Sequence, residues 1–221
     1  MTGAISDAAR DKFIEAHARL QAPPLTPEIQ LWLAAEATPL WEATESFLKI
    51  EGLPPPFWAF AWAGGQALAR YVMDNPDLVR GHRVADFGAG GGIVSIAALK
   101  AGAASAMAID LDPFAAAATR QNGVANGVTP QTLTGDATDC DASDFDVILA
   151  GDVSYERDQS ADGRRWIDAA AHRGALVLIG DPGRTYLDRD GLVALASYDV
   201  PTPVALEREP ITPTTIWQVW A

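Results

Sequence analysis

The sequence has little of what builds disulfides and most metal sites. Its 221 residues include one cysteine and three histidines. The lone Cys140 excludes an internal disulfide and fits a reducing compartment, so we expect a cytoplasmic protein. Asp139, Asp141 and Asp144 lie near it in the sequence, but no histidine accompanies them and the spacing of a calcium loop is absent. We therefore predict no metal site.

Long apolar runs and positive charge are also scarce. The most apolar stretch, residues 91–109, contains Lys100 and many glycines, so we expect no membrane span, and the charged first residues predict no secretory signal. The chain has 16 Lys and Arg against 29 Asp and Glu, a net charge of −13. Since binding nucleic acid requires basic side chains, we predict no nucleic-acid partner. The acidity fits a basic protein partner, or simply keeps the protein in solution.

What the sequence does have is a glycine-rich turn between two short apolar strands. Residues 84–87 fit a strand, a glycine cluster follows, residues 93–99 fit a helix, and a second strand ends at Asp110. This is a βαβ unit, whose first turn places backbone N–H groups and a helix N-terminus beside a ligand. The length suits a single α/β domain with a sizeable core.

The spacing of the glycines distinguishes between ligands. A dinucleotide fingerprint would need a third glycine at position 93, which is Ile93. The chain instead has an acidic residue followed by alternate glycines (Asp86, Gly88, Gly90 and Gly92). This pattern resembles the first motif of the class I S-adenosylmethionine (SAM) methyltransferases, in which the glycines let the backbone approach the methionine part of the cofactor. Asp110 stands where an acidic residue binds ribose hydroxyls, roughly 20 residues on. Another nucleotide or a flavin stays an alternative.

The other elements predicted from the pattern complete a Rossmann-like α/β fold. We expect a seven-stranded class I methyltransferase sheet with helices on both faces, formed by residues 51–221, and an N-terminal helical extension, residues 1–50, packed on it. The predicted helices are 6–20, 26–33, 66–73, 114–126 and 164–172, with a short element at 42–49; the further strands are 132–133, 145–150, 175–179, 192–198 and 214–220, the last two an antiparallel hairpin.

Residues 52–62, GLPPPFWAFAW, form a rigid aromatic segment directly before the predicted helix 66–73. The three prolines favour an extended chain. The position suits a wall or lid over the cofactor and the acceptor. Packing in the core is the alternative.

Two further turns carry candidate site residues. The apolar run 145–150 is typical of a central parallel strand, and it delivers Asp152 and Tyr155 to the carboxyl edge of the sheet, where ligands bind in such folds. Asp152 could also simply cap its own turn. The third strand ends at Asp136, and in class I methyltransferases the residue there meets the adenine amino group, so Asp136 and the Ala137 backbone are candidates.

Three longer stretches together resemble one family. They are PPPFWAFAWAGGQALARYVMDNPDLVRGHRVADFGAGGG, DVSY after the fourth strand and GDPGR after the fifth. They are similar to the electron transfer flavoprotein beta-subunit lysine methyltransferases, and the resemblance covers about residues 52–221. It implies transfer of methyl groups from SAM to lysines of that subunit. It also implies that Asp152 and Tyr155, as a D-x-x-Y motif, lie at the acceptor lysine channel, and that Trp62 and Gly65 line the methionine end of the cofactor.

Other functions stay open at this point. The enzyme could methylate another protein or a small molecule, or the chain could be a SAM-binding module without catalysis. Ile93, which stands where a dinucleotide fingerprint needs its third glycine, argues against a nicotinamide-dependent oxidoreductase. The absence of an N-P-P-Y sequence at residues 151–155 argues against methylation of DNA or glutamine. We expect a monomer, because no heptad or exposed apolar helix requires a partner.

Overall fold

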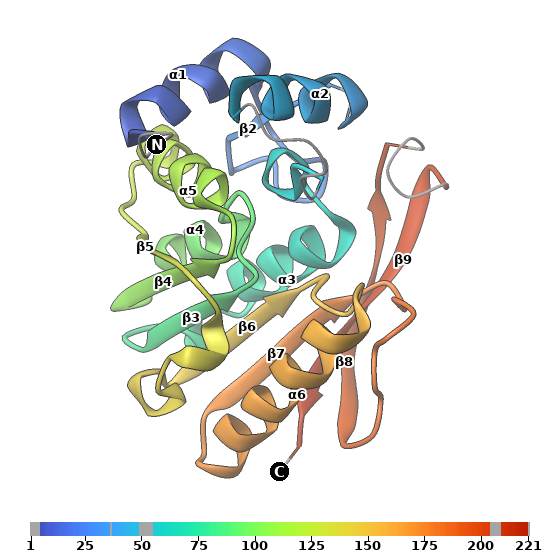
Figure 1. The fold of residues 1–221 in the computed structure, drawn as a ribbon. Helices are drawn as coiled ribbons and strands as arrows, with labels where there is room; N and C mark the ends of the chain where they lie inside the picture. The colour runs from blue at the N-terminus through green and yellow to red at the C-terminus, as the bar shows by residue number, and fades with distance from the viewer. Residues whose placement is uncertain (1–4, 36, 49–54, 204–208, 221) are drawn as a thin grey trace.

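A seven-stranded mixed sheet forms the centre of the protein. The computed structural model describes residues 5–35, 37–48, 55–203 and 209–220 (Figure 1). The strands follow the order β5-β4-β3-β6-β7-β9-β8. Five of them run parallel, and β9 lies antiparallel between β7 and β8. Their bounds are β3 Arg83–Phe87, β4 Ser105–Asp110, β5 Gln131–Thr134, β6 Val147–Gly151, β7 Leu176–Asp181, β8 Leu192–Pro201 and β9 Ile211–Val219. The predicted fold, including the closing hairpin, is confirmed.

Helices cover both faces of this sheet, as predicted (Figure 1). One face carries α3 (Ala63–Asp74), α4 (Ile93–Lys100) and α5 (Pro113–Asn126); the other carries α6 (Arg157–His172) with the short turns η3 (Ala137–Asp139) and η4 (Ala142–Asp144). Alternate residues of a strand point to opposite faces, so Val147 packs against α3 and α4 whereas Ile148 packs against α6. None of the described helices is long and apolar enough to cross a bilayer.

Local sequence explains where the helices begin and end. Asp112 caps α5 by accepting a hydrogen bond from the backbone N–H of Phe114 at 2.8 Å, and Pro113 takes the first helical position. Gly127 ends α5 in the left-handed conformation, with φ of 69°. Asn75 and Pro76 end α3, as the sequence predicts.

The N-terminal region is only partly helical. The helix predicted at 6–20 is confirmed as α1 (Asp7–His17), which is capped by Ser6 and ends before the strand that begins at Arg19. Helix α2 (Ala37–Leu48) covers most of the short element expected at 42–49. The predicted helix at 26–33 is wrong. There the chain forms β2 (Leu31–Leu33), which pairs antiparallel with β1 (Arg19–Gln21). The domain boundary predicted at residue 50 lies outside the described residues.

Side chains of α5 explain why residues 26–33 are not helical. The amide oxygens of Asn126 and Asn122 accept hydrogen bonds from the backbone N–H groups of Gln30 and Trp32, at 2.9 and 2.7 Å. A helix would have directed these N–H groups to its own carbonyls. Tertiary contacts therefore override a helical pattern that is apolar at the right intervals.

An aromatic cluster joins the N-terminal region to the domain. Phe13 of α1 lies edge-on to Phe114 of α5, with ring centroids 5.3 Å apart, and Trp58 of η1 (Phe57–Ala59) stacks on the same Phe114 ring at 6.0 Å. Phe13, Trp58 and Phe114 are buried. Burial of a large aromatic side chain contributes about 2–3 kcal/mol, so this cluster fixes the early helix beside the glycine turn.

Candidate active site

The turn after β3 is shaped by glycines in the left-handed conformation. Gly88, Gly90 and Gly92 have φ values of 66°, 53° and 75°. Residues with a Cβ atom rarely adopt this region, so the alternation of glycines follows from the path of the backbone. A Cβ on the neighbouring Gly91 would lie 2.8 Å from the carbonyl oxygen of Trp58. The aromatic segment and the turn are therefore in direct backbone contact.

A buried carboxylate near the end of β3 supports this turn. Asp86 is buried, and one of its oxygens accepts hydrogen bonds from the backbone N–H and the hydroxyl of Ser95, at 2.8 and 2.7 Å. Burial raises the pKa of Asp86 to about 6, although these bonds act against the shift. Asp86 thus ties the turn to the first residues of α4, and a direct role in cofactor binding stays a prediction.

Asp110 lies at the end of β4, beside the turn. Its carboxylate accepts hydrogen bonds from the backbone N–H groups of Gly90 and Asp112, at 2.8 and 2.9 Å. Burial raises the pKa values of Asp110 and Asp112, that of Asp112 to about 6. The structure brings Asp110 to the predicted glycine turn, where its carboxylate could accept hydrogen bonds from a diol.

The turn after β5 holds the predicted adenine-side residues. Asp136 caps η3 by accepting hydrogen bonds from the backbone N–H and the hydroxyl of Thr138, at 2.8 and 2.7 Å. Ala137 is buried against the face of the sheet that α6 covers. Asp141 caps η4 in the same way, through the N–H of Ser143 at 2.9 Å. The carboxylates of Asp136 and Asp141 therefore fix short turns, and contact of Asp136 with adenine stays a prediction.

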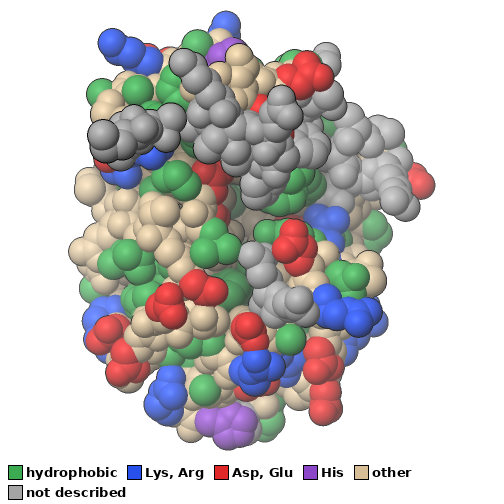
Figure 2. Space-filling model, in the orientation of Figure 1, with side chains coloured by type: hydrophobic (Ala, Val, Ile, Leu, Met, Phe, Trp, Pro, Cys, Tyr) green, Lys and Arg blue, Asp and Glu red, His purple; other side chains and the backbone are tan. Residues whose placement is uncertain are grey.

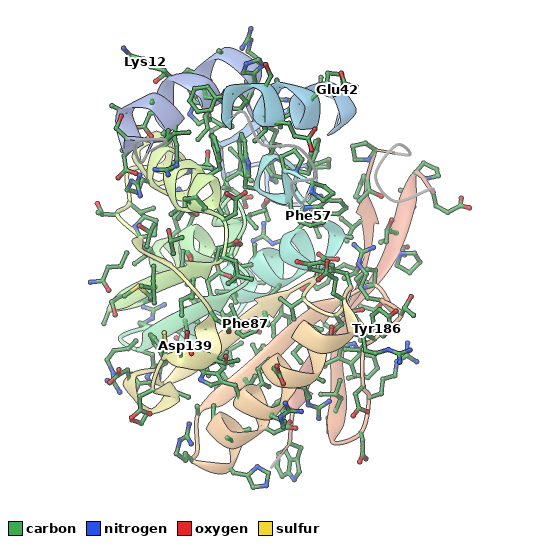
Figure 3. All side chains as sticks on the ribbon, viewed as in Figure 1. Lys12, Glu42, Phe57, Phe87, Asp139 and Tyr186 are labelled. Carbon is green, nitrogen blue, oxygen red and sulfur yellow. The ribbon has the colours of Figure 1, made fainter. Side chains whose placement is uncertain are left out.

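The aromatic segment divides into a packed part and a part that faces the site. Trp58 and Phe60 are buried in the aromatic cluster, as the packing alternative predicts. Phe57 and Trp62 are partly exposed, and Phe57 lies 5.2 Å from the ring of Tyr155. Figure 3 labels Phe57 on η1, on the side of the sheet where β6 ends. The packing alternative is confirmed for Trp58 and Phe60, whereas a wall over the cofactor and cofactor binding by Trp62 stay predictions.

Asp152 follows β6 and joins three separate segments. It is buried, with φ of 58°, and its N–H donates to the carbonyl of Gly180 at 3.0 Å. One carboxylate oxygen accepts from the N–H of Gly65 in α3 at 3.0 Å. The other accepts from Nε and Nη2 of Arg184, at 3.0 and 2.5 Å. These donors are 87 and 32 residues away, so Asp152 links segments rather than capping only its own turn.

Tyr155 lies on the open side of the same turn. Its side chain is 44% exposed. Partial burial raises the pKa of its phenol to about 12, and the negative charges of Asp110 and Glu156 add to the shift. A Cβ on Gly88 would lie 3.0 Å from a methyl group of Val153, so the glycine turn and the turn after β6 lie side by side. Figure 2 shows the surface of this face hollowed near its centre, with acidic side chains at the hollow.

Comparisons with known proteins agree with this geometry. The family model described as ribosomal protein L11 methyltransferase (PrmA) matches residues 67–152. Electron transfer flavoprotein beta subunit lysine methyltransferase of Danio rerio is 37% identical over 201 residues, covering 88% of this chain and 76% of the relative. The protein of that name from Homo sapiens is 33% identical over 224 residues, covering 97% and 84%. The chain belongs to the electron transfer flavoprotein beta subunit lysine methyltransferase family.

A solved structure shows the same fold at low identity. Magnesium protoporphyrin IX methyltransferase from Synechocystis with bound SAH gives a TM-score of 0.52 at 16% identity, covering 71% of this chain and 81% of that chain. The family and the fold of the chain are thus both those of methyltransferases. The resemblance inferred from the three sequence stretches is confirmed.

Two residues that hydrogen-bond to the candidate site were not assigned from the sequence. Arg184 stands in the GDPGR stretch, which carries the family resemblance, but nothing in the sequence pairs it with Asp152. Asn122 lies within a helix and is fully buried, and its amide group donates to the carbonyl of Gly91 at 2.8 Å. The sequence did contain a signal for Asn122, since it stands among alanines on a helix face expected to be buried, and a buried amide needs hydrogen-bond partners.

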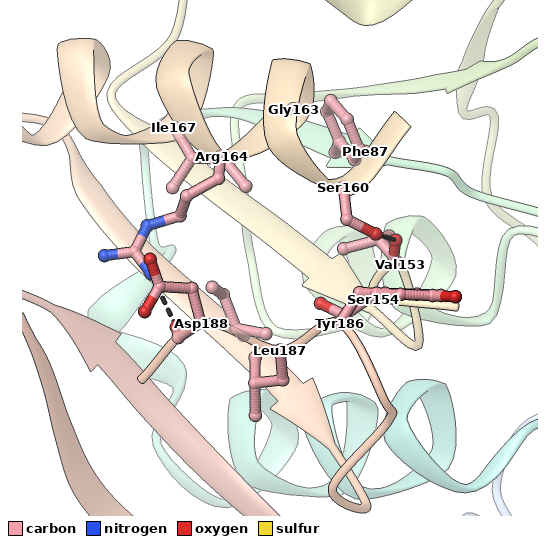
Figure 4. A pocket seen from close by; sticks show the side chains of 11 residues that line it. Phe87, Val153, Ser154, Ser160, Gly163, Arg164, Ile167, Tyr186, Leu187 and Asp188 are labelled. Atoms are coloured by element: carbon pink, nitrogen blue, oxygen red, sulfur yellow. Dashed lines mark hydrogen bonds between the residues drawn. The ribbon is translucent and has the colours of Figure 1, made fainter. Parts of the chain in front are cut away.

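A small cavity lies beside the turn after β6, between α6 and the loop after β7 (Figure 4). Its volume of about 30 Å³ is small for a ligand site. Arg164 of α6 crosses beside it and donates to the backbone carbonyls of Asp188 and Asp190, at 2.6 and 2.5 Å. The loop that carries Arg184 is therefore fastened to α6.

Proposed function

We propose that this protein transfers methyl groups from SAM to lysine side chains of the beta subunit of an electron transfer flavoprotein. The observation that carries the proposal is the meeting of two turns at one edge of the sheet, where a Cβ on Gly88 would lie 3.0 Å from a methyl group of Val153. The glycine turn with Asp110 lies on the cofactor side, and Asp152 with Tyr155 lies on the acceptor side. Membership of the family supports the choice of acceptor.

The residues of the glycine turn fit SAM. The left-handed glycines leave the backbone uncovered by side chains, and the N-terminus of α4 begins directly after Gly92. Asp110, held by Gly90, offers carboxylate oxygens to ribose hydroxyls, and its negative charge suits a cationic ligand. Trp62 and Gly65 lie next to Asp152 and Arg184, where the methionine end would lie. When bound, SAM supplies a methyl group on a positively charged sulfur.

The acceptor must reach that methyl group as a neutral amine. A lysine of pKa ~10.4 costs about 4.6 kcal/mol to deprotonate at pH 7. We propose that Asp152 draws the lysine ammonium to the edge of β6 and that water takes the proton. The hydroxyl of Tyr155 then orients the amine so that its lone pair faces the methyl group. Because methyl transfer is an in-line displacement, positioning and exclusion of water are what these residues contribute.

The surroundings of the enzyme are part of the proposal. The net charge of −13 suits approach to a lysine-bearing face of a protein and disfavours nucleic acid. The single Cys140 fits a reducing compartment, and we propose the cytoplasm. We propose that the chain acts as a monomer.

The test is methyl transfer to a defined acceptor. Purified protein is incubated with labelled SAM and recombinant flavoprotein beta subunit, and the labelled residue is identified after digestion. We expect methyl-lysine. Asp110→Ala should lower SAM affinity about tenfold or more by calorimetry and lose most labelling, because a carboxylate hydrogen bond of this kind contributes about 1.5–3 kcal/mol. Asp199→Asn, an exposed carboxylate of β8, is the matched control.

The outcome separates the competing substrates. An unlabelled beta subunit together with a different labelled protein in a cell extract would keep the chemistry and discard the acceptor. The family model for ribosomal protein L11 methyltransferase matches residues 67–152, which end at Asp152 before Tyr155 and Arg184. This match covers the cofactor side of the site, so it does not favour ribosomal protein L11 as the acceptor.

A further inference from the structure

Arg184 contacts both the acceptor side and the cofactor side of the site. Its guanidinium donates to one oxygen of Asp152 through Nε and Nη2, at 3.0 and 2.5 Å. The side chains are 22% and 9% exposed, so water screens this ion pair only partly. The guanidinium also lies 5.8 Å from the centre of the Trp62 ring. Arg184 therefore connects Asp152 with Trp62, two residues that the sequence assigned to different ligands.

The fold holds the backbone of Arg184 in place. The buried Asp181, at the end of β7, accepts hydrogen bonds from the N–H groups of Gly183 and Arg184, at 2.6 and 2.7 Å. Further along, the N–H of Tyr186 donates to the carbonyl of Ser154 at 3.2 Å, and Arg164 binds the end of the loop. Figure 4 shows Tyr186 and Ser154 beside each other at the cavity. An arginine anchored this way is pre-organised, so little entropy is lost when it pairs.

The charge of Asp152 creates a difficulty that Arg184 removes. A carboxylate beside a lysine normally raises the pKa of that lysine, by ~1–3 units for an unscreened partner, and so opposes deprotonation. A carboxylate already paired with a guanidinium forms a nearly neutral unit. It keeps oxygen atoms that orient an amine, while it no longer favours the ammonium form.

We propose that Arg184 is a positioning residue of the acceptor site, which fixes Asp152 and offsets its negative charge so that the acceptor lysine loses its proton near neutral pH. This inference rests on the proposed function. It assigns a role to the GDPGR stretch, and it explains how a carboxylate can guide a lysine without keeping it charged.

Several other charged groups lie on the elements around this pair. Asp110 at the end of β4 and Glu156 before α6 act on Tyr155 with negative charge. Asp181 of β7 has a raised pKa from burial, against which the positive charges of Arg184 and Arg189 act. From α3, the first turn contributes neutral residues only, among them Gly65. Among the described residues, Arg184 is the cation whose ion pair with Asp152 is seen, so its removal is expected to change the charge at Asp152.

The experiment measures the single-turnover rate of lysine methylation against pH, with SAM-loaded enzyme and saturating acceptor, because this rate reports groups in the complex. In Arg184→Gln, we expect the rising limb of the profile to move up by about one pH unit or more. The rate should fall about tenfold or more at pH 7 and recover most of the wild-type value near pH 10. Arg184→Lys, which keeps the charge, should keep the wild-type limb even if the rate is lower.

Two further variants make the result specific. The double variant Arg184→Gln with Asp152→Asn removes both charges, so its limb should return toward that of the wild type. Arg189→Gln, an exposed arginine of the same loop that stacks on Trp217, should keep the wild-type limb. Melting temperature and SAH affinity, measured for each variant without turnover, identify any variant that has lost its fold or its cofactor site.

The outcomes are distinct. An equal loss of rate at every pH in Arg184→Gln would overturn the inference and leave Arg184 a purely structural residue. If the wild type does not methylate the beta subunit, the proposed acceptor fails, and the same pH series on the protein labelled in an extract tests Arg184. Absence of any labelled acceptor would overturn both proposals.

Discussion

The turns after β3 and β6 lie side by side but are built by different means. After β3, the left-handed positions are glycines, and backbone N–H groups and helix α4 form the surface offered to a ligand. After β6, Asp152 takes the left-handed conformation, the one non-glycine residue with positive φ in the described part of the chain. This conformation costs roughly 1–2 kcal/mol for most residues and less for aspartate. Its hydrogen bonds to Gly65 and Arg184 offset that cost.

The difference teaches which half of the site is general and which is specific. A backbone surface holds a ligand common to many enzymes, whereas a cluster of side chains can select one acceptor. The family model for ribosomal protein L11 methyltransferase matches residues 67–152, which contain the glycine turn and stop at Asp152. The side chains that come after it, Tyr155 and Arg184, are therefore the place to look for acceptor choice.

The largest effect is expected where the two halves meet, at Gly64 in the first turn of α3. A Cβ there would lie 2.2 Å from the carbonyl oxygen of Gly180 and 2.5 Å from a carboxylate oxygen of Asp152. Gly64→Ala should destabilise the protein by about 3 kcal/mol, because backbone must move, and lower the melting temperature by roughly 6–12 °C. It should also displace Asp152 and reduce methyl transfer.

Gly127→Ala is the matched control for this change. Gly127 ends α5 with positive φ but has open space around it. Alanine there should cost only about 1 kcal/mol through backbone strain. Equal losses of stability in the two variants, by thermal or chemical denaturation, would show that the close approach of α3 to β6 and β7 is unimportant.

An intermediate effect is expected under the cofactor turn, at Asp86. Its pKa is about 6 in the folded protein, against an ordinary value of 3.8. The folded state therefore holds this proton more tightly, so the free energy of unfolding should decrease as pH rises from 4 to 7, by about 2 kcal/mol from this group. Asp86→Asn, which keeps an oxygen for Ser95, should lose that part of the slope in denaturation curves.

Asp112 offers an independent check of the same effect. Burial raises its pKa to about 6 as well, so Asp112→Asn should flatten the slope in the same pH window, while asparagine still caps α5. A slope unchanged in both variants would mean that these carboxylates are as well solvated in the folded chain as in the unfolded one.

The smallest effect is expected on the acceptor side, at Tyr155. With a pKa near 12 its phenol stays protonated at working pH. Tyr155→Phe should therefore lower the single-turnover rate only about threefold to tenfold, the loss of one hydrogen bond of ~1 kcal/mol, without moving the pH limb. Tyr186→Phe, which keeps the ring that Arg157 stacks on, is the control. A loss of SAM affinity in Tyr155→Phe would instead place Tyr155 on the cofactor side.

Much of the fold was predictable, because its signals are local. The glycine turn, the helix 114–126 and the apolar strands each depend on neighbours in sequence, and the structure confirms them. The helix predicted at 26–33 failed because Asn122 and Asn126 lie about 90 residues away, with separations of 90 and 96 for the two hydrogen bonds. A local pattern contains no information about such partners.

The candidate site follows the same rule. Asp152 and Tyr155 could be assigned to the carboxyl edge because strand order brings it there. The partner of Asp152 could not, since Arg184 reaches it from the loop of the next strand. Within the aromatic segment, only the burial seen in the structure distinguishes Trp58, which packs in the core, from Phe57, which faces Tyr155.

Asn122 links the N-terminal strands to the glycine turn. The same amide side chain accepts from the N–H of Trp32 at 2.7 Å and donates to the carbonyl of Gly91 at 2.8 Å. Docking of β2 and ordering of the glycine turn are therefore coupled through Asn122. We expect a ligand that stabilises the turn to slow hydrogen exchange at the Trp32 amide as well. Through this one side chain, helix α5 joins the first strands to the glycine turn.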